Sequence, residues 1–171
     1  TEYRTGILAN DFQFALGRPI DTPGLQFWLG QMANGLTLQG FRIKLVSSDE
    51  AFGNAGGANQ PWVDVLYQSI LGRDADPGGE AYYTGLLNSG TPREQVAGVF
   101  FNSHEFLAGL VDAEYLFYLL RRSDQGGNDY WVNLLASGYR EESFIANLIG
   151  SSEYLGLALN SFPLPPATAT T

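Results

Sequence analysis

The stretch that decides the fold is LGRDADPGGEAYYTGLLNSGTPREQVAGVFFNSHEF, residues 71–106. Asp76 followed by Pro77 is typical of a helix start, because the Asp side chain caps free amides and proline suits the first turn. Tyr83 and Leu87 are four residues apart, which is the spacing of one buried helical face. The stretch therefore predicts helices separated by tight turns.

The landmarks of this stretch recur once before it and once after it, at offsets of 55 and 48 residues. The aligned positions are Arg18, Arg73 and Arg121; Asp21, Asp76 and Asp124; Gly24, Gly79 and Gly127; the aromatic pairs 27–28, 82–83 and 130–131; Gly35, Gly90 and Gly138; and Glu50, Glu105 and Glu153. Self-similarity of this length is the signature of a repeat architecture. We predict an all-α fold of three tandem helical repeats, with about three helices each, packed into one compact array.

The repeats suggest a division of the chain into five parts. These are a lead-in at 1–8, repeat 1 at 9–56, an insert with repeat 2 at 57–112, repeat 3 at 113–159, and a tail at 160–171. Seven residues without a counterpart fall in the run GNAGGANQP, residues 53–61. The Pro/Thr-rich tail is expected to be a linker or a disordered end.

Residues 71–106 resemble the bacterial family called domain of unknown function 4214, whose pattern is Leu-Gly-Arg, Asp-x-x-Gly-x-x-aromatic, Gly, then Ser-x-Glu-aromatic. The resemblance extends over residues 9–159 in three copies, and the third copy departs at Leu120 and Tyr154. Members of the family sit as helical modules in large secreted or surface proteins, including S-layer-like and adhesin-like ones. The resemblance implies an extracellular, non-catalytic role in anchoring or in recognition of surface polysaccharide.

Composition excludes several partner classes. The net charge is −9, and Lys44 is the only lysine, which argues against nucleic acid and against an anionic membrane surface. The longest charge-free stretches are too polar to insert into a membrane. The acidic, cysteine-free composition suggests an exported bacterial protein. Because the chain starts at Thr1 without a signal-like apolar run, we expect a fragment or a processed product.

The repeated charged residues have structural interpretations. We expect ion pairs that tie the first helix of each repeat to the third, namely Arg18 with Glu50, Arg73 with Glu105, and Arg121 with Glu153. We expect helix caps at Asp21, Asp76 and Asp124, and a capping box formed by Thr91 and Glu94. A functional constellation of these Arg and Glu residues is the alternative. A calcium loop at 74–80 is a weaker hypothesis, because Asp74 is not repeated.

Features that occur once are better candidates for ligand binding than repeated ones. Trp62 follows Asn59 and Gln60 in the insert, which combines an aromatic platform with amides able to bind hydroxyl groups. Tyr139 and Arg140 occupy the matching turn of repeat 3. The structural alternative for Trp62 is a residue that closes the insert over the core. The repeated aromatic pairs are expected in the core, and stacking on sugar rings is the alternative. Adjacent helical residues point about 100° apart, so one member of each pair, or its rim, is expected to be exposed.

Catalysis finds little support in the sequence. His104, the sole histidine, stands between Ser103 and Glu105, and neighbours on a helix do not face each other. One histidine without cysteine does not make a usual zinc site. We expect a non-enzyme without metal or cofactor.

Two functions remain as hypotheses. The first is a binding and anchoring module whose partner is surface or extracellular polysaccharide, or further copies of itself. The alternative is a structural assembly or spacer subunit without a small ligand, in which calcium or low pH would reduce acidic repulsion and promote assembly. Intracellular scaffolding is a third hypothesis, because the pattern also resembles phycobilisome linker domains, although the acidic charge and the tail weigh against it.

Overall fold

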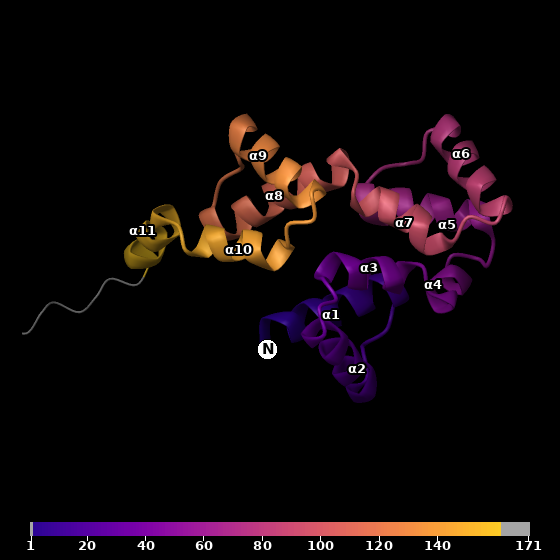
Figure 1. Cartoon of the computed structure of the whole chain (residues 1–171), viewed down its shortest axis with the longest axis horizontal. Helices are drawn as coiled ribbons and strands as arrows, with labels where there is room; N and C mark the ends of the chain where they lie inside the picture. The colour runs from indigo at the N-terminus through magenta and orange to yellow at the C-terminus, as the bar shows by residue number, and fades with distance from the viewer. Residues whose placement is uncertain (1, 162–171) are drawn as a thin grey trace, which may run out of the picture. The chain divides into compact units, whose positions relative to one another are not determined.

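The computed structural model of the chain describes residues 2–161 and the surroundings of side chains 4–160. Between residues 2 and 161 it is helical with short turns and has no β-strand, which confirms the all-α prediction (Figure 1). The predicted tail at 160–171 falls mostly on 162–171, which lie outside the described residues.

The helices follow the predicted turn residues closely. Their bounds are α1 Glu2–Leu16, α2 Thr22–Ala33, α3 Leu38–Val46, α4 Asp49–Asn54, α5 Asn59–Leu66, the π-helix η1 Tyr67–Leu71, α6 Pro77–Asn88, α7 Arg93–Phe101, α8 His104–Leu119, α9 Gln125–Ala136, α10 Glu141–Ile149 and α11 Ser152–Ser161. Gly35, Gly90 and Gly138 follow α2, α6 and α9 with φ of 104°, 95° and 95°. A positive φ suits glycine, so each helix ends where the sequence predicted.

The chain divides into two compact units, one ending at Phe106 and the other beginning at Leu107. The single array expected from the sequence is thereby corrected to two units. The physical reason is that the side chains after Leu107 bury one another. Val111 is wholly buried, and the Tyr115 and Phe144 rings stack with their centroids 6.4 Å apart.

The first unit begins with the core that α1, α2 and α3 share. Leu8, Phe12 and Leu16 of α1 pack with Met32 of α2 and Phe41 of α3. These positions are four apart along α1, so they form one apolar stripe. Leu8 is wholly buried, and residues 2–8 of the expected lead-in are part of the opening helix.

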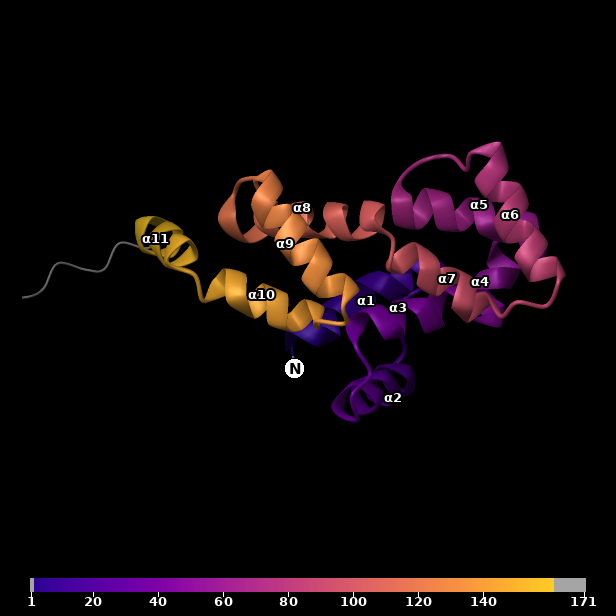
Figure 2. The same ribbon diagram turned by 45° about the horizontal axis from the view of Figure 1, so that its top comes forward.

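A second core in the same unit lies beneath α5, η1, α6 and α7. Trp62, Leu66 and Tyr67 pack with Leu87 of α6 and Phe100 of α7. The two cores meet where α3 lies against α7, as both ribbon views show (Figures 1 and 2). The Gln39 side-chain amide donates to the Phe101 carbonyl across this contact, at 2.7 Å.

The insert interrupts a helix that is continuous elsewhere. In α8, which contains Glu105, the helix runs without a break through 16 residues from His104 to Leu119. After Glu50, the equivalent path is split into α4 and α5 by a turn in which Gly56 and Gly57 have φ of 101° and 68°. Such dihedrals end a helix, so the insert redirects the chain.

The second unit repeats the packing of the first with α8, α9 and α10. The Trp131 ring of α9 lies 4.8 Å from the Phe144 ring of α10, and its Nε1 donates to the Tyr115 hydroxyl at 3.1 Å. α11 packs on α10. Across both units, none of the described helices is long and apolar enough to cross a membrane.

Candidate functional site

The three expected Arg–Glu pairs meet in the structure as bidentate contacts. Arginine Nε lies 2.5 Å from Oε1 of its partner in Arg18–Glu50, 2.6 Å in Arg73–Glu105 and 2.5 Å in Arg121–Glu153. In every case Nη2 also donates to Oε2, at 2.8 or 2.9 Å. Two parallel N–H···O bonds fix both distance and angle between the elements that carry them.

The glutamates of these pairs lie on a different helix from the one predicted. Each stands in the first turn of the helix after the third one, α4, α8 or α11, rather than on the third helix itself. The reason is the serine two residues earlier: Ser48, Ser103 and Ser151 each accept a hydrogen bond from the amide three residues on, which starts a new helix. The ion pair therefore joins the end of one opening helix to the start of the next.

Each guanidinium also lies over an aromatic ring of the opening helix. The distances from arginine Cζ to the ring centroid are 5.4 Å for Arg18 on Phe12, 4.9 Å for Arg73 on Tyr67 and 5.2 Å for Arg121 on Tyr115. Hydrogen bonds from the arginines lower the pKa of Glu50, Glu105 and Glu153. The aromatic ring covers one face of each guanidinium, and the carboxylate accepts from two of its N–H groups. Little of the guanidinium is therefore left to bind a ligand.

The predicted caps have the expected geometry. The side chains of Asp21, Asp76 and Asp124 accept hydrogen bonds from Gly24, Gly79 and Gly127 amides at 2.7, 2.8 and 2.8 Å. The capping box predicted at Thr91 and Glu94 was wrong. Pro92 is the N-cap of α7 without a side-chain cap bond, and Glu94 instead pairs with Lys44 at 3.3 Å.

The aromatic pairs divide as the geometry of a helix requires. Trp28, Tyr83 and Trp131 pack inward, while the first members, Phe27, Tyr82 and Tyr130, are 57%, 61% and 60% exposed. Within each pair the rings meet edge to face, with centroids 5.1, 5.1 and 5.0 Å apart. Three equivalent exposed rings therefore stand on described helices.

Trp62 takes the structural alternative, in which it closes the insert over the core, and its prediction as an exposed stacking platform was wrong. Its side chain is 1% exposed, and its Nε1 donates to the Val46 carbonyl at 2.9 Å. The physical reason is the turn at the insert, which directs the first turn of α5 into the core beside Phe52, ring centroids 6.5 Å apart. A ring without accessible faces cannot stack on a sugar.

The other predicted ligand residues divide between the two units. Asn59 is half-buried and donates to Asn88 at 2.8 Å, whereas Gln60 is exposed. Tyr139 and Arg140 belong to the second unit, where the Tyr139 hydroxyl accepts from Asn147 at 3.0 Å. Arg140 Nη2 lies 3.3 Å from a carboxylate oxygen of Glu142.

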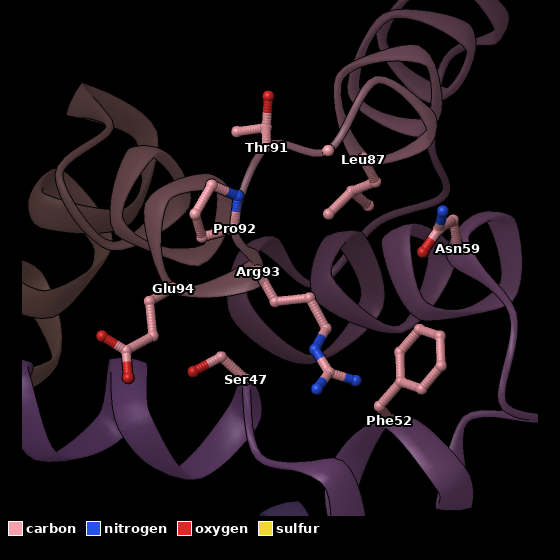
Figure 3. A pocket seen from close by; sticks show the side chains of 9 residues that line it. Ser47, Phe52, Asn59, Leu87, Thr91, Pro92, Arg93 and Glu94 are labelled. Atoms are coloured by element: carbon pink, nitrogen blue, oxygen red, sulfur yellow. The ribbon is translucent and has the colours of Figure 1, made fainter.

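Asn59 does line a shallow pocket of about 540 Å³ in the first unit (Figure 3). The other lining residues come from the end of α3, from α4, from the end of α6 and from the start of α7: Ser47, Phe52, Leu87, Gly90, Thr91, Pro92, Arg93 and Glu94. The lining thus combines polar side chains with apolar ones, which is the usual composition of a small-molecule site.

Arg93 is the central charged group of this pocket. Its Cζ lies 4.3 Å above the Phe52 ring, and its Nη2 donates to Asp49 Oδ1. The Arg93 side chain is 25% exposed, whereas the Asp49 side chain is 96% exposed. Figure 3 shows the guanidinium extending from α7 to the Phe52 ring on α4.

Sequence reasoning missed Arg93, although a signal was present. At the offsets that align the three segments, its equivalents are Leu38, which is wholly buried, and Glu141, which is 6% exposed. A position that changes from leucine to arginine is not explained by the scaffold that the segments share. Because features that occur once are better candidates for ligand binding than repeated ones, Arg93 could have been chosen as a candidate from the sequence.

A second, smaller pocket of about 360 Å³ lies in the second unit between α8 and the start of α9. Asp112 accepts from the Ser123 hydroxyl at 2.5 Å, and this hydrogen bond lowers its pKa. Asn128 donates to the Ala108 carbonyl at 3.2 Å. These bonds hold the loop before α9, so the polar groups serve the fold.

Metal and nucleophile chemistry lack a constellation in the part of the chain that the structure describes. No three His, Cys, Asp or Glu side chains gather there as a metal site. In the segment considered for calcium, Asp74 accepts from Gln68 and Asp76 caps α6. His104 is exposed at the start of α8.

Comparison with known proteins gives one match. Residues 42–110 match the family model described as domain of unknown function (DUF4214). The match runs from α3 into α8 and contains every residue that lines the Arg93 pocket. No curated protein and no solved structure matches the chain significantly.

Proposed function

We propose that this chain, with its match to the DUF4214 model over residues 42–110, is a non-catalytic binding and anchoring module that recognises polysaccharide at a cell surface or outside the cell. We propose further that it contains three copies of the family's helical unit, one for each set of aligned landmarks. The observation that carries the proposal is the Arg93 pocket, whose lining combines amide, hydroxyl and charged groups with apolar side chains.

The chemistry of the pocket suits a sugar. Asn59 and Thr91 supply groups that both donate to and accept from hydroxyls, while Leu87 and Pro92 offer apolar surface to the C–H face of a ring. Each net hydrogen bond contributes about 1 kcal/mol, so one sugar would bind weakly. A polymer presents many equivalent sugars, and tandem modules would then gain avidity.

The test measures retention of the full chain in native gels that contain soluble polysaccharides, both neutral and acidic. We expect retention by at least one polymer, and a loss of retention in the double variant Asn59→Ala, Thr91→Ala. Gln60→Ala is the matched control, because it removes a neighbouring amide outside the pocket lining. Equal mobility with and without every polymer would overturn the proposal, as would equal losses in the control.

The alternative is a structural assembly or spacer subunit of a surface layer, adhesin or filament. It is favoured by the exposed rings of Phe27, Tyr82 and Tyr130. These rings occupy equivalent positions in the three aligned segments, and repeated exposed apolar groups suit contacts between copies of the protein. Sedimentation velocity separates the two functions. Assembly that grows with calcium or low pH and disappears when the three rings become serine would favour this alternative.

A further inference from the structure

The Arg93 pocket contains a guanidinium that is held in place but weakly paired. The guanidinium lies over the Phe52 ring, with Cζ 4.3 Å from the ring centroid, and this contact restricts where the side chain can go. Among the described residues, its side chain has one hydrogen bond, from Nη2 to Asp49. An arginine fork can bind a carboxylate through two parallel bonds, so part of its donor capacity is unused.

The partner of Arg93 is easy to displace. Asp49 is 96% exposed, and ion pairs between exposed groups contribute little because water screens them. The repeated pairs differ: Arg73 and Glu105 bind through two bonds, and both side chains are about half exposed. A ligand carboxylate at Arg93 would replace one solvated anion with another in a better geometry.

The other charges around the pocket allow an anion to enter. Glu94 lines it, but the Lys44 ammonium lies 3.3 Å from its carboxylate and offsets its charge. Pro92 and Arg93 also place the pocket at the amino end of α7, where the helix dipole favours negative charge. Asn59 and Thr91 remain for hydroxyl groups beside the carboxylate.

We infer that the pocket selects acidic saccharides, with the carboxylate of a uronate bound by Arg93 in place of Asp49 and the ring hydroxyls by Asn59 and Thr91. This inference rests on the proposed function and deepens it. Arg93 determines the charge of the ligand, and Asp49 is a competitor that occupies the guanidinium when no ligand is bound.

The test is calorimetric titration of the full chain with a galacturonate oligosaccharide and with the same oligosaccharide after reduction of its carboxyl groups to alcohols. We expect the acidic form to bind at least tenfold more tightly. Arg93→Gln should remove this difference, and Arg93→Lys, which keeps the charge without the fork, should restore part of it. Thermal unfolding of each variant checks that the fold is retained.

Asp49→Asn provides the sharper measurement, because removal of the competitor should tighten binding of the acidic form several-fold. Asp129→Asn is the matched control, since it makes the same charge change on an exposed residue of α9. Equal gains in both variants, or weaker binding in Asp49→Asn, would overturn the inference. Equal binding of the acidic and reduced forms would overturn it while leaving the proposed function intact, and binding of neither form would count against both.

Discussion

The path from α4 to α5 and the single helix α8 are two versions of one connection between neighbouring segments. Both begin with a serine N-cap and a glutamate that forms an ion pair with an arginine. Both lead to a tyrosine, Tyr67 or Tyr115, whose ring lies under the guanidinium of an arginine. In α8 the connection is an unbroken helix, whereas the insert breaks the other into two helices with a turn between them. Phe52 and Asn59, on either side of that turn, both line the Arg93 pocket. The comparison teaches that an insertion can form a pocket while the serine cap and the arginine–glutamate pair at the start of the connection are kept.

The largest effect should come from removing the insert. Deletion of residues 55–61 joins Asn54 to Trp62 and aligns Asp64 with Asp112 of α8. We expect one continuous helix, as in α8, and complete loss of saccharide binding because Asn59 is gone and Phe52 is redirected. Hydrogen exchange across the junction and the gel retention assay measure both effects. Retained binding would show that the site does not depend on the turn.

Truncation of Trp62 should have the next largest effect, on stability. Trp62→Ala removes a wholly buried ring and its bond to the Val46 carbonyl, and large aromatic truncations cost about 3–5 kcal/mol. Leu110→Ala in α8 is the comparison, because Leu110 follows the same alignment but is only partly buried. Urea unfolding measures the two losses. Equal losses would contradict the core position of Trp62.

Gly79 and Gly127 occupy equivalent positions, but a side chain at each would meet the tyrosine of its connection at a different distance. A Cβ on Gly79 would lie 2.0 Å from the Tyr67 hydroxyl, whereas one on Gly127 would lie 3.4 Å from that of Tyr115. Gly79→Ala should therefore cost about 1–3 kcal/mol, as overpacking does, and Gly127→Ala much less. Adding Tyr67→Phe should recover most of the loss at Gly79, since it removes the clashing oxygen. Denaturant titration of the three variants measures their free energies of unfolding and tests this order.

A smaller effect, a gain of stability rather than a loss, is expected from a substitution just after the end of α8. Leu120 has φ of 56°, and at the equivalent position Gly72 has φ of 68°. A left-handed conformation costs a residue with a Cβ roughly 1 kcal/mol, and the Leu120 side chain is 73% exposed, so it gains little from packing. Leu120→Gly should raise the melting temperature of the second unit, while Gly72→Leu should lower that of the first.

The pH dependence should have the smallest amplitude. Arginine hydrogen bonds lower the pKa of Glu50, Glu105 and Glu153 below 4.5, so the folded protein holds these protons less tightly than the unfolded chain. Their contribution is complete above about pH 4.5 and is lost as pH falls through the lowered pKa values. Burial raises the pKa of Asp11, and this residue has the opposite dependence. Stability of the triple Glu→Gln variant should change less with acid than that of the natural chain.

The sequence alone determined the all-α fold, most of the helix ends and the partners of the repeated ion pairs. A cap, a turn glycine and a spacing of four are local properties, because each depends on residues within one or two turns. The Asp76 cap and the Gly90 turn could therefore be predicted from the local pattern. The Arg73–Glu105 contact joins residues far apart in the chain, and it was its recurrence in three segments that made it predictable.

Only the tertiary structure decided what the insert does. Whether Trp62 faces solvent or core depends on the direction in which α5 leaves the turn at Gly56 and Gly57. That direction goes with the packing of α5 against α6 and the bond from Trp62 to the Val46 carbonyl at the end of α3. For the same reason, no local signal placed Arg93 over Phe52, which is 41 positions earlier in the chain. Long-range contacts of this kind select one arrangement among many that the same local pattern permits.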